Sequence, residues 1–282
     1  MINNLSNALL SLAEIPCVHR PSSHTYIFLK TSIRNEIETV FGPKGVQQMS
    51  FSKIGILKFP FCKMGKITTL DLFGLDELII LSFYYQNRRR YKRFVDIGAN
   101  LGLHSIMCSM MGYKVVSFEP DPIHFKKFST NIMLNNQNKI NRQQAAVSTH
   151  RGTCKFVRVL GNTTGSHLAG AKESYGRKEM FDVKIQPIDE IFINADLIKI
   201  DAEGHEARIL LKTKKKDWRN TDVIVEIGSI KNRSIIYKHC SALGINMFPQ
   251  KIGWSVASSK SDLPTSHREG SLFLSLKSKM PW

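Results

Sequence analysis

The sequence predicts an α/β domain built on a mostly parallel sheet, and three observations carry that prediction. The stretch 93–121 reads as a strand, a glycine turn, a helix and a second strand, a unit that gives parallel neighbours through a right-handed crossover. Further apolar runs of strand length follow it, several of them ending on an acidic residue. The last two runs have no helix between them, which predicts an antiparallel hairpin at one edge of the sheet.

The first strand of this unit ends at Gly98, and the second strand spans 114–118. Between them, apolar residues recur at helical spacing, namely Leu103, Ile106, Met107, Met110 and Met111. Ligands of parallel sheets bind at the carboxyl ends of the strands. We therefore expect the loop 96–102 and the acids Glu119 and Asp121 to face one crevice.

The glycine turn favours a nucleoside without phosphates over NAD. A dinucleotide fingerprint needs a glycine where this chain has Asn100, because the backbone must approach a pyrophosphate closely there. The remaining pattern, Asp-x-Gly-x-x-x-Gly from Asp96 to Gly102, leaves room for a ligand, and Glu119 can bind both ribose hydroxyls. S-adenosylmethionine fits this description. The alternative is that the glycines only turn the strand into the helix and that Glu119 is a solvated strand end.

The segment before this unit gives weaker signals. The elements expected there are short helices at 2–12 and 33–40, a hairpin within 54–72 that turns at Met64-Gly65, and a helix at 75–86. The first 50 residues hold too few apolar side chains for a core of their own. We therefore expect an N-terminal extension, residues 1–90, that packs on a main domain formed by residues 91–282.

After the unit, helices and strands continue to alternate. The expected elements are a helix at 122–136, a strand at 143–147, a two-strand excursion at 153–160 and 181–186, a strand at 196–200, a helix around 207–211, a strand at 222–227, a helix at 234–243 and strands at 245–248 and 271–276. The polar loop 161–167 should lie on the ligand side of the sheet, where long loops are often functional, and a disordered surface tip is an equally good interpretation. Four strand ends present acids to one rim, namely Asp96, Glu119, Asp201 with Glu203, and Glu226.

The charge balance predicts an anionic partner without naming it. Forty Lys and Arg against 23 Asp and Glu leave a formal net charge of +17, which suits nucleic acid, anionic lipid headgroups or an acidic sugar. Two basic clusters, 88–93 and 212–216, lie where helices are expected to end, so they also complement helix dipoles.

Cysteine usage and the N-terminal stretch favour a cytoplasmic protein. The five cysteines are widely spaced and include no Cys-x-x-Cys, so they indicate neither a disulfide framework nor a zinc site. The first apolar run lacks a basic start and ends at Glu14, unlike a signal peptide. No run of about 18 uncharged apolar residues predicts a transmembrane segment.

Six segments resemble, in order and spacing, the FkbM family of S-adenosylmethionine-dependent methyltransferases. They are FVDIGANLGLHSI (94–106), SFEPDPIHF (117–125), AAVSTHRG (145–152), NTTGSHL (162–168), DLIKIDAEGHEARIL (196–210) and VIVEI (223–227). The first is common to many methyltransferases, whereas DLIKIDAEGHE is much more particular to this family. The resemblance implies a Rossmann-like class I methyltransferase fold, with a mostly parallel seven-stranded sheet, an antiparallel C-terminal hairpin and helices on both faces.

The resemblance also implies S-adenosylmethionine as the cofactor. Its binding residues would be Asp96, Gly98, Asn100, Gly102, Glu119, Ala146 and Asp201. Glu119 would hold the ribose hydroxyls, Ala146 would lie near the adenine edge, and Asp201 would lie near the methionine amine or the reacting methyl group. The family's better-known members methylate hydroxyl oxygens of macrocycles, sugars and related small molecules. Substrate choice is expected to depend on residues 1–50 and on the loop 160–180.

A hydroxyl acceptor needs a base that takes its proton. The catalytic residues we predict are Asp201 with Glu203, at the end of the fourth strand, followed by His205, whose ordinary pKa suits the task. His104 and Glu226 are further candidates on the rim. No spacing of His, Asp and Glu declares a metal site, and a divalent cation held by Asp201, Glu203 and Glu226 is a minor hypothesis.

The acceptor is expected to be a small molecule or a carbohydrate, such as a sugar, nucleotide sugar or glycan, and the charge of the chain favours an anionic one. An RNA methyltransferase is the alternative, motivated by the basic residues, although no motif for RNA binding or amine methylation follows the fourth strand. A cofactor-binding scaffold without turnover is a third hypothesis.

Overall fold

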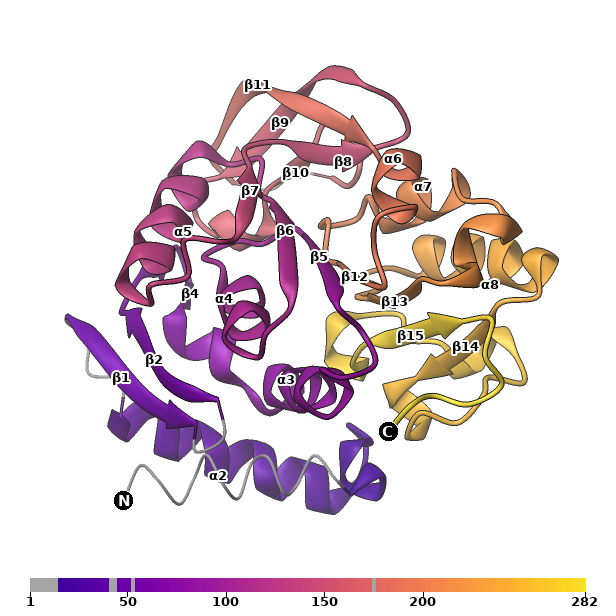
Figure 1. Cartoon of the computed structure of the whole chain (residues 1–282), viewed down its shortest axis with the longest axis horizontal. Coiled ribbons are helices and arrows are strands. Elements are labelled where there is room, and N and C mark those ends of the chain that lie inside the picture. Colours follow the sequence, from indigo (N-terminus) through magenta and orange to yellow (C-terminus); the bar gives the residue numbers. More distant parts are fainter. Residues whose placement is uncertain (1–14, 41–44, 52–53, 174–175) are drawn as a thin grey trace.

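A seven-stranded sheet lies between two layers of helices in the computed structural model, which describes residues 15–40, 45–51, 54–173 and 176–282 (Figure 1). The strands are, in spatial order, β14 (Asn246–Pro249), β15 (Leu272–Ser275), β13 (Asp222–Val225), β12 (Leu197–Ile200), β5 (Arg93–Ile97), β6 (Lys114–Phe118) and β7 (Asn141–Gln143). Strand β15 runs antiparallel to both of its neighbours, and the other pairs are parallel. The predicted α/β class, the mostly parallel sheet and the antiparallel C-terminal hairpin are confirmed.

Helices cover both faces of this sheet. On one face lie α3 (Leu75–Asn87), α4 (Leu103–Met110) and α5 (Pro122–Leu134), and on the other lie α6 (Ile188–Phe192), α7 (Glu206–Leu211) and α8 (Ile230–Leu243) (Figure 1). Successive strand residues point to opposite faces, so Phe94 packs in the core of the first face and Val95 in that of the second. The strands are apolar on both sides because both sides are buried. The sequence predicted these helices apart from α6, and α8 begins earlier than predicted because the Ser229 hydroxyl caps it.

The predicted strand 143–147 is wrong as one element. Strand β7 pairs with β6 in the main sheet, but the chain turns at once, with the Ala145 N–H donating to the Gln143 carbonyl at 3.0 Å. Strand β8 (Ala146–Ser148) then pairs with the excursion. The run 143–147 therefore contributes to two different sheets. A segment of five residues is too short for its hydrophobic pattern to show the turn between them.

The predicted excursion is a four-stranded sheet that stands beside the carboxyl end of the main sheet (Figure 1). Its strands are, in spatial order, β10 (His167–Leu168), β9 (Gly152–Val159), β11 (Lys178–Pro187) and β8. A buried ion pair ties it to the main sheet, because Arg158 on β9 binds the carboxylate of Asp121 through two hydrogen bonds of 2.7 Å.

The N-terminal part packs against α3 and α5. Its elements are α2 (His24–Val40), β1 (Val46–Phe51), β2 (Gly55–Pro60), β3 (Lys63–Met64) and β4 (Ile67–Thr68). The turn at Gly65 was predicted, whereas the β1–β2 hairpin was not. Helix α2 begins at His24 rather than at residue 33, because the Ser23 hydroxyl accepts the Tyr26 N–H at 3.1 Å and so caps the helix. The helix predicted at 2–12 lies outside the described residues, and the domain division at residue 90 stays a prediction.

Short 3-10 helices complete the described chain. They are η1 (Pro16–His19), η2 (Thr69–Phe73), η3 (Thr163–Gly165), η4 (Lys215–Arg219), η5 (Gln250–Ile252), η6 (Lys260–Asp262) and η7 (His267–Glu269). Over the part of the chain that the structure describes, no helix is long and apolar enough to cross a membrane.

Candidate active site

A cavity of about 690 Å³ opens at the carboxyl ends of the parallel strands. Its walls come from the turn after β5, the end of β6, the loops after β12 and β13, the excursion and the N-terminal part. A volume of this size suits a cofactor together with a small substrate. The fold therefore forms a cavity at the strand ends, where the ligand site was predicted.

The glycine turn is shaped by one close backbone approach. Gly98 has φ +82, and a Cβ atom built on it would lie 1.9 Å from the carbonyl oxygen of Asp201. Gly102 has φ +89, and its Cβ would collide with the ring of Phe128 at 2.0 Å. Both positions therefore require glycine, the first to bring β5 against the loop after β12 and the second to pack α5 against the start of α4.

Asn100 lies between these glycines and lines the cavity. It adopts φ 52, a left-handed conformation that costs energy for a residue with a side chain. Its buried Oδ1 atom has no hydrogen-bond partner among the described residues. A buried acceptor without a partner is costly, so this atom is suited to receive a hydrogen bond from a ligand.

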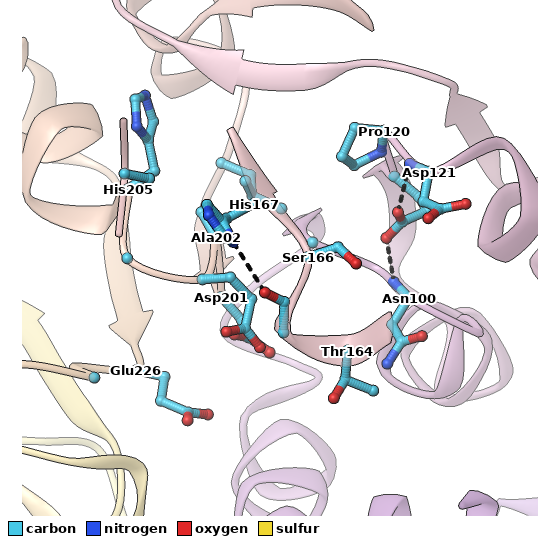
Figure 2. Close-up of a pocket in the computed structure, with 18 of the residues that line it drawn as sticks. Asn100, Pro120, Asp121, Thr164, Ser166, His167, Asp201, Ala202, His205 and Glu226 are labelled. Atoms are coloured by element: carbon cyan, nitrogen blue, oxygen red, sulfur yellow. Dashed lines mark hydrogen bonds between the residues drawn. The ribbon is translucent and has the colours of Figure 1, made fainter. Parts of the chain in front are cut away.

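Glu119 lies at the end of β6 and faces the same cavity. One carboxylate oxygen accepts the Asn100 N–H at 2.7 Å and the other accepts the Asp121 N–H at 2.8 Å, as the dashed lines in Figure 2 show. Burial raises the pKa of Glu119 to about 8 although both backbone N–H groups favour its charged form. Each oxygen keeps a further lone pair, so two ligand hydroxyls can still donate to it.

Asp96 lies beneath the cavity and is not part of its lining. Its Oδ2 atom accepts the Ser105 hydroxyl at 2.5 Å, and its Oδ1 atom lies 3.9 Å from the ammonium of Lys199. That ammonium is also 3.3 Å from Asp201. Burial opposes the charge of Lys199, but the surrounding carboxylates raise its pKa. The Lys199 ammonium therefore lies between two of the predicted acids, Asp96 of β5 and Asp201 after β12.

The loop after β12 presents Asp201 and Glu203 to the cavity. Glu203 has φ 51, and it pairs with Lys172 of the excursion. Burial first, and then the charge of Asp201, raise the pKa of Glu203 to about 7, while Lys172 opposes the rise. A carboxylate with a pKa near neutrality is well matched to proton transfer.

Glu206 holds this loop in shape, and the sequence reasoning missed it. Its Oε1 atom accepts the N–H groups of Ala202 at 3.0 Å and Gly204 at 2.9 Å, and its Oε2 atom accepts the Asn232 side-chain amide at 2.7 Å. The sequence carried two signals for it, its place as the last residue of the DLIKIDAEGHE segment and its place in the first turn of α7, and neither gives the role of its side chain.

Glu226, at the end of β13, lines the cavity; its backbone N–H donates to the Ile200 carbonyl at 3.1 Å, and its carboxylate forms no hydrogen bond with a described residue. Burial, followed by the charges of Asp201 and Glu77, raises its pKa well above the ordinary value. Figure 2 shows the carboxylates of Asp201 and Glu226 on the same side of the cavity. Two strand ends thus bring together carboxylates that are far apart in the sequence.

The two histidines predicted on the rim are engaged with protein groups. The Nε2 atom of His205 lies 2.9 Å from the Ser148 hydroxyl, and burial lowers the pKa of His205 to about 4. Its ring is turned away from Asp201 and Glu226 (Figure 2). The Nε2 atom of His104 lies 2.7 Å from Glu77, at the floor of a smaller cavity of about 30 Å³.

The polar loop of the excursion closes one side of the cavity with residues 162–168. The Lys66 N–H donates to the Gly161 carbonyl at 3.0 Å, and the Thr163 hydroxyl lies 2.9 Å from Nε2 of His124. These contacts order the loop, which contradicts the interpretation as a disordered tip, and a functional role of the loop stays a prediction. Among the described residues, no three His, Cys, Asp or Glu side chains are grouped so that they hold a metal ion.

The sheet order, the glycine turn and the acid at the end of β6 define a Rossmann-like domain of the methyltransferase class. The family model described as "Methyltransferase FkbM domain" matches residues 96–243. The chain belongs to this family, and the resemblance noted in the sequence is confirmed.

One curated relative and two solved structures show how far the similarity extends. The methyltransferase sdnD of Sordaria araneosa is 25% identical over 169 residues, which are 47% of this chain and 64%, less than two thirds, of that relative. A precorrin-6y C5,15-methyltransferase from Geobacter metallireducens is 10% identical with a TM-score of 0.37, over 67% of this chain and 82% of the other. A putative RNA methyltransferase from Pyrococcus horikoshii is 11% identical with a TM-score of 0.37, over 87% of this chain and 95% of the other.

Membership of the family implies S-adenosylmethionine as the cofactor, and the residues present fit it. Glu119 offers two acceptor atoms to a ribose, and the buried Oδ1 of Asn100 is an acceptor in need of a donor, whereas the space beside Gly98 is filled by the carbonyl of Asp201 rather than left for a ligand. Ala146, predicted at the adenine edge, also lines the cavity.

Proposed function

We propose that this protein is an O-methyltransferase that uses S-adenosylmethionine to methylate a hydroxyl group of a small molecule or a carbohydrate. The observation that carries the proposal is the group of carboxylates, Asp201, Glu203 and Glu226, in the cavity that also receives the glycine turn. When bound, the cofactor would supply an electrophilic methyl group, so the protein has to position the acceptor and remove its proton.

The proton acceptor in this proposal is Glu203, assisted by Asp201. Burial, followed by the charge of Asp201, raises the pKa of Glu203 to about 7, where a carboxylate is both partly ionised and basic enough to take a hydroxyl proton as the bond to carbon forms. Lys172 limits the rise in the pKa of Glu203, and its ion pair with Glu203 fixes the direction of the Glu203 side chain. Asp201 also lies beside the ammonium of Lys199, which keeps its carboxylate in place at the strand end.

His205 has a positioning role in this proposal rather than a role as base. Its Nε2 atom is engaged by the Ser148 hydroxyl, and the ring is buried between β8 and α7. The histidine therefore links the excursion to the loop that carries Asp201 and Glu203.

The acceptor would lie on the side of the cavity built by the N-terminal part and the C-terminal η7 segment. Lys30, Asp71, Glu77 and His267 line that side. Lys30 and Lys172 are the two lysines in the cavity lining, and both pair with acids, Asp76 and Glu203, whereas eight Asp and Glu residues line the same cavity. We therefore propose a neutral hydroxyl compound, and the anionic acceptor that the overall charge suggested stays a prediction. The excursion loop and α2 supply the specificity, in keeping with the predicted roles of the loop 160–180 and residues 1–50.

An RNA acceptor stays the alternative. The basic clusters that motivated it, 88–93 and 212–216, flank the beginnings of β5 and β13, whereas the cavity lies at the ends of these strands. The charge that attracts RNA and the proposed methyl-transfer site are thus at opposite ends of the sheet.

Screening sugars, nucleotide sugars and RNA as acceptors with labelled S-adenosylmethionine tests the proposal. Label should pass to a hydroxyl of a small molecule or carbohydrate, and Asp201→Ala should lose turnover. Cofactor binding without transfer to any hydroxyl compound, or transfer to RNA alone, would refute it.

A further inference from the structure

The amino ends of the parallel strands form a basic edge opposite the cavity. Strands β5, β12 and β13 are in parallel register, so the residues that precede them share one edge of the sheet. A groove of about 540 Å³ lies there, which we call the amino-edge groove; Lys212, Lys214, Lys216, Arg219 and Ile193 are among its lining residues. Strands of four or five residues separate it from the cavity by about 15 Å.

Four of the five cations that line the amino-edge groove have no carboxylate partner among the described residues, whereas the fifth, Arg93, pairs with Asp196. Lys212, Lys214, Lys216 and Arg219 are exposed and form no ion pair with a described residue. The acid within this segment, Asp217, uses its Oδ2 atom to accept the backbone N–H of Lys214 at 2.7 Å. Some cations elsewhere on the surface, such as Lys155 and Lys251, have carboxylate partners, and others, such as Lys126, have none among the described residues, so the groove is distinguished by the grouping of its four unpaired cations.

Two exposed aliphatic side chains accompany these cations. Ile193 lines the groove and is 68% exposed, and Leu211, which precedes Lys212, is 51% exposed. Phe192, which lines the groove, is buried, and so are the neighbouring aromatic residues Tyr91, Tyr113 and Trp218. Single-stranded nucleic acid binds by stacking its bases on exposed aromatic rings, which this edge lacks among its described residues. It would also not explain why Ile193 and Leu211 are exposed. Basic side chains beside exposed aliphatic ones instead match the headgroup and acyl boundary of an anionic bilayer.

We propose that the amino-edge groove and Leu211 bind the surface of an anionic phospholipid bilayer. The cations contact lipid phosphates, and Ile193 and Leu211 enter the boundary between headgroups and acyl chains. The association is peripheral and electrostatic. Since the cavity lies at the other end of the strands, its mouth stays open to water while the protein is bound.

Vesicle flotation of the full chain without cofactor tests this proposal independently of methyl transfer. The probes are vesicles of phosphatidylcholine alone and of phosphatidylcholine with about 30 mol% phosphatidylserine, a composition that carries the negative surface charge of anionic leaflets. The protein should bind only the second kind, and less as salt rises. Equal binding to both kinds of vesicle, or no binding to the anionic ones, would overturn the proposal.

Two variants locate the surface. The triple variant Lys212→Glu, Lys214→Glu and Lys216→Glu should weaken binding to the anionic vesicles on the order of 100-fold. The double variant Ile193→Ser and Leu211→Ser should weaken it about tenfold while the charge is kept.

The matched control is Lys126→Glu, Lys178→Glu and Lys184→Glu, which makes the same change in charge at exposed lysines of α5 and β11. It should bind almost as the unchanged protein does. Equal losses in both triple variants would show that only net charge matters, and binding of a single-stranded RNA but not of the vesicles would assign the groove to nucleic acid; either result contradicts the proposal. Circular dichroism of each variant verifies that it is folded.

Discussion

The backbone of Gly98 lies directly against the carbonyl group of Asp201, so close that a Cβ atom on Gly98 would come within 1.9 Å of the carbonyl oxygen. This contact joins the turn that would cradle the cofactor to the loop that carries the proposed base. The two parts of the site are therefore one rigid unit at the ends of neighbouring strands.

Replacing Gly98 by alanine should disrupt this unit. We expect Gly98→Ala to lower the affinity for S-adenosylmethionine at least about tenfold and to lower the melting temperature, because β5 and the Asp201 loop must separate. Gly112→Ala is the matched control, since Gly112 also has positive φ, +94, but has open space around its Cβ position. Calorimetric titration and thermal unfolding measure both effects. Equal losses in the two variants would mean that backbone conformation alone, rather than the contact with Asp201, requires glycine at position 98.

Glu203 should set the pH dependence of turnover. With a pKa of about 7, it becomes a competent base as the pH rises through neutrality, so the rate should rise with pH in that range. Glu203→Gln should lower kcat by about 10²- to 10⁴-fold and abolish this rise. A pH profile of kcat for the wild type and the variant measures both; an unchanged profile in Glu203→Gln would place the base elsewhere.

Replacing Lys172 tests the assignment of Glu203 as the base through the direction of a pKa shift. Its charge lowers the pKa of Glu203, so Lys172→Met should raise that pKa and move the rising limb of the pH profile to higher pH. Asp201→Asn removes a charge that raises the pKa and should move the limb to lower pH, at a reduced rate. Shifts in the same direction for both variants would contradict the electrostatic account.

Replacing His205 should affect stability more than the pH profile. His205→Phe combined with Ser148→Ala removes the buried pair without leaving a polar atom unsatisfied. We expect kcat within about tenfold of the wild type and a rising limb near the same pH, because the ring faces away from the carboxylates. Loss of that limb would identify His205 as the base.

The buried pair between Arg158 and Asp121 should hold the excursion in place. Arg158→Met leaves Asp121 charged and buried without its partner, which should lower the free energy of unfolding by about 3–5 kcal/mol. Burial raises the pKa of Asp121, but the Arg158 hydrogen bonds prevail and hold it below its ordinary value. The stability from this pair is therefore complete above the ordinary pKa of about 3.9 and is lost as the pH falls through the lowered one.

Urea unfolding at pH 7 and at about pH 3 tests both parts of this prediction. The wild type should lose more stability between the two pH values than Arg158→Met. The double variant Arg158→Met and Asp121→Asn should recover part of the loss at pH 7. An Arg158→Met protein as stable as the wild type would show that the excursion is held by its strand pairing alone.

The sequence by itself determined the succession of the main-sheet strands along the chain, the glycine turn, the acids at the strand ends and the family. These features are local, since a short apolar run, a glycine and the carboxylate after it follow one another in the chain. The parallel register then forces the strand ends to one rim.

Only the tertiary structure decided which of these groups meet. It placed Asp96 beneath the cavity, turned His205 toward Ser148, and revealed Glu206 as the residue that holds the Asp201 loop. It also brought Arg93, Lys212, Lys214, Lys216 and Arg219 to one groove at the amino edge, away from the carboxylates of the cavity. The direction of a side chain and the approach of two backbones depend on packing between distant segments, which spacing along one chain does not contain.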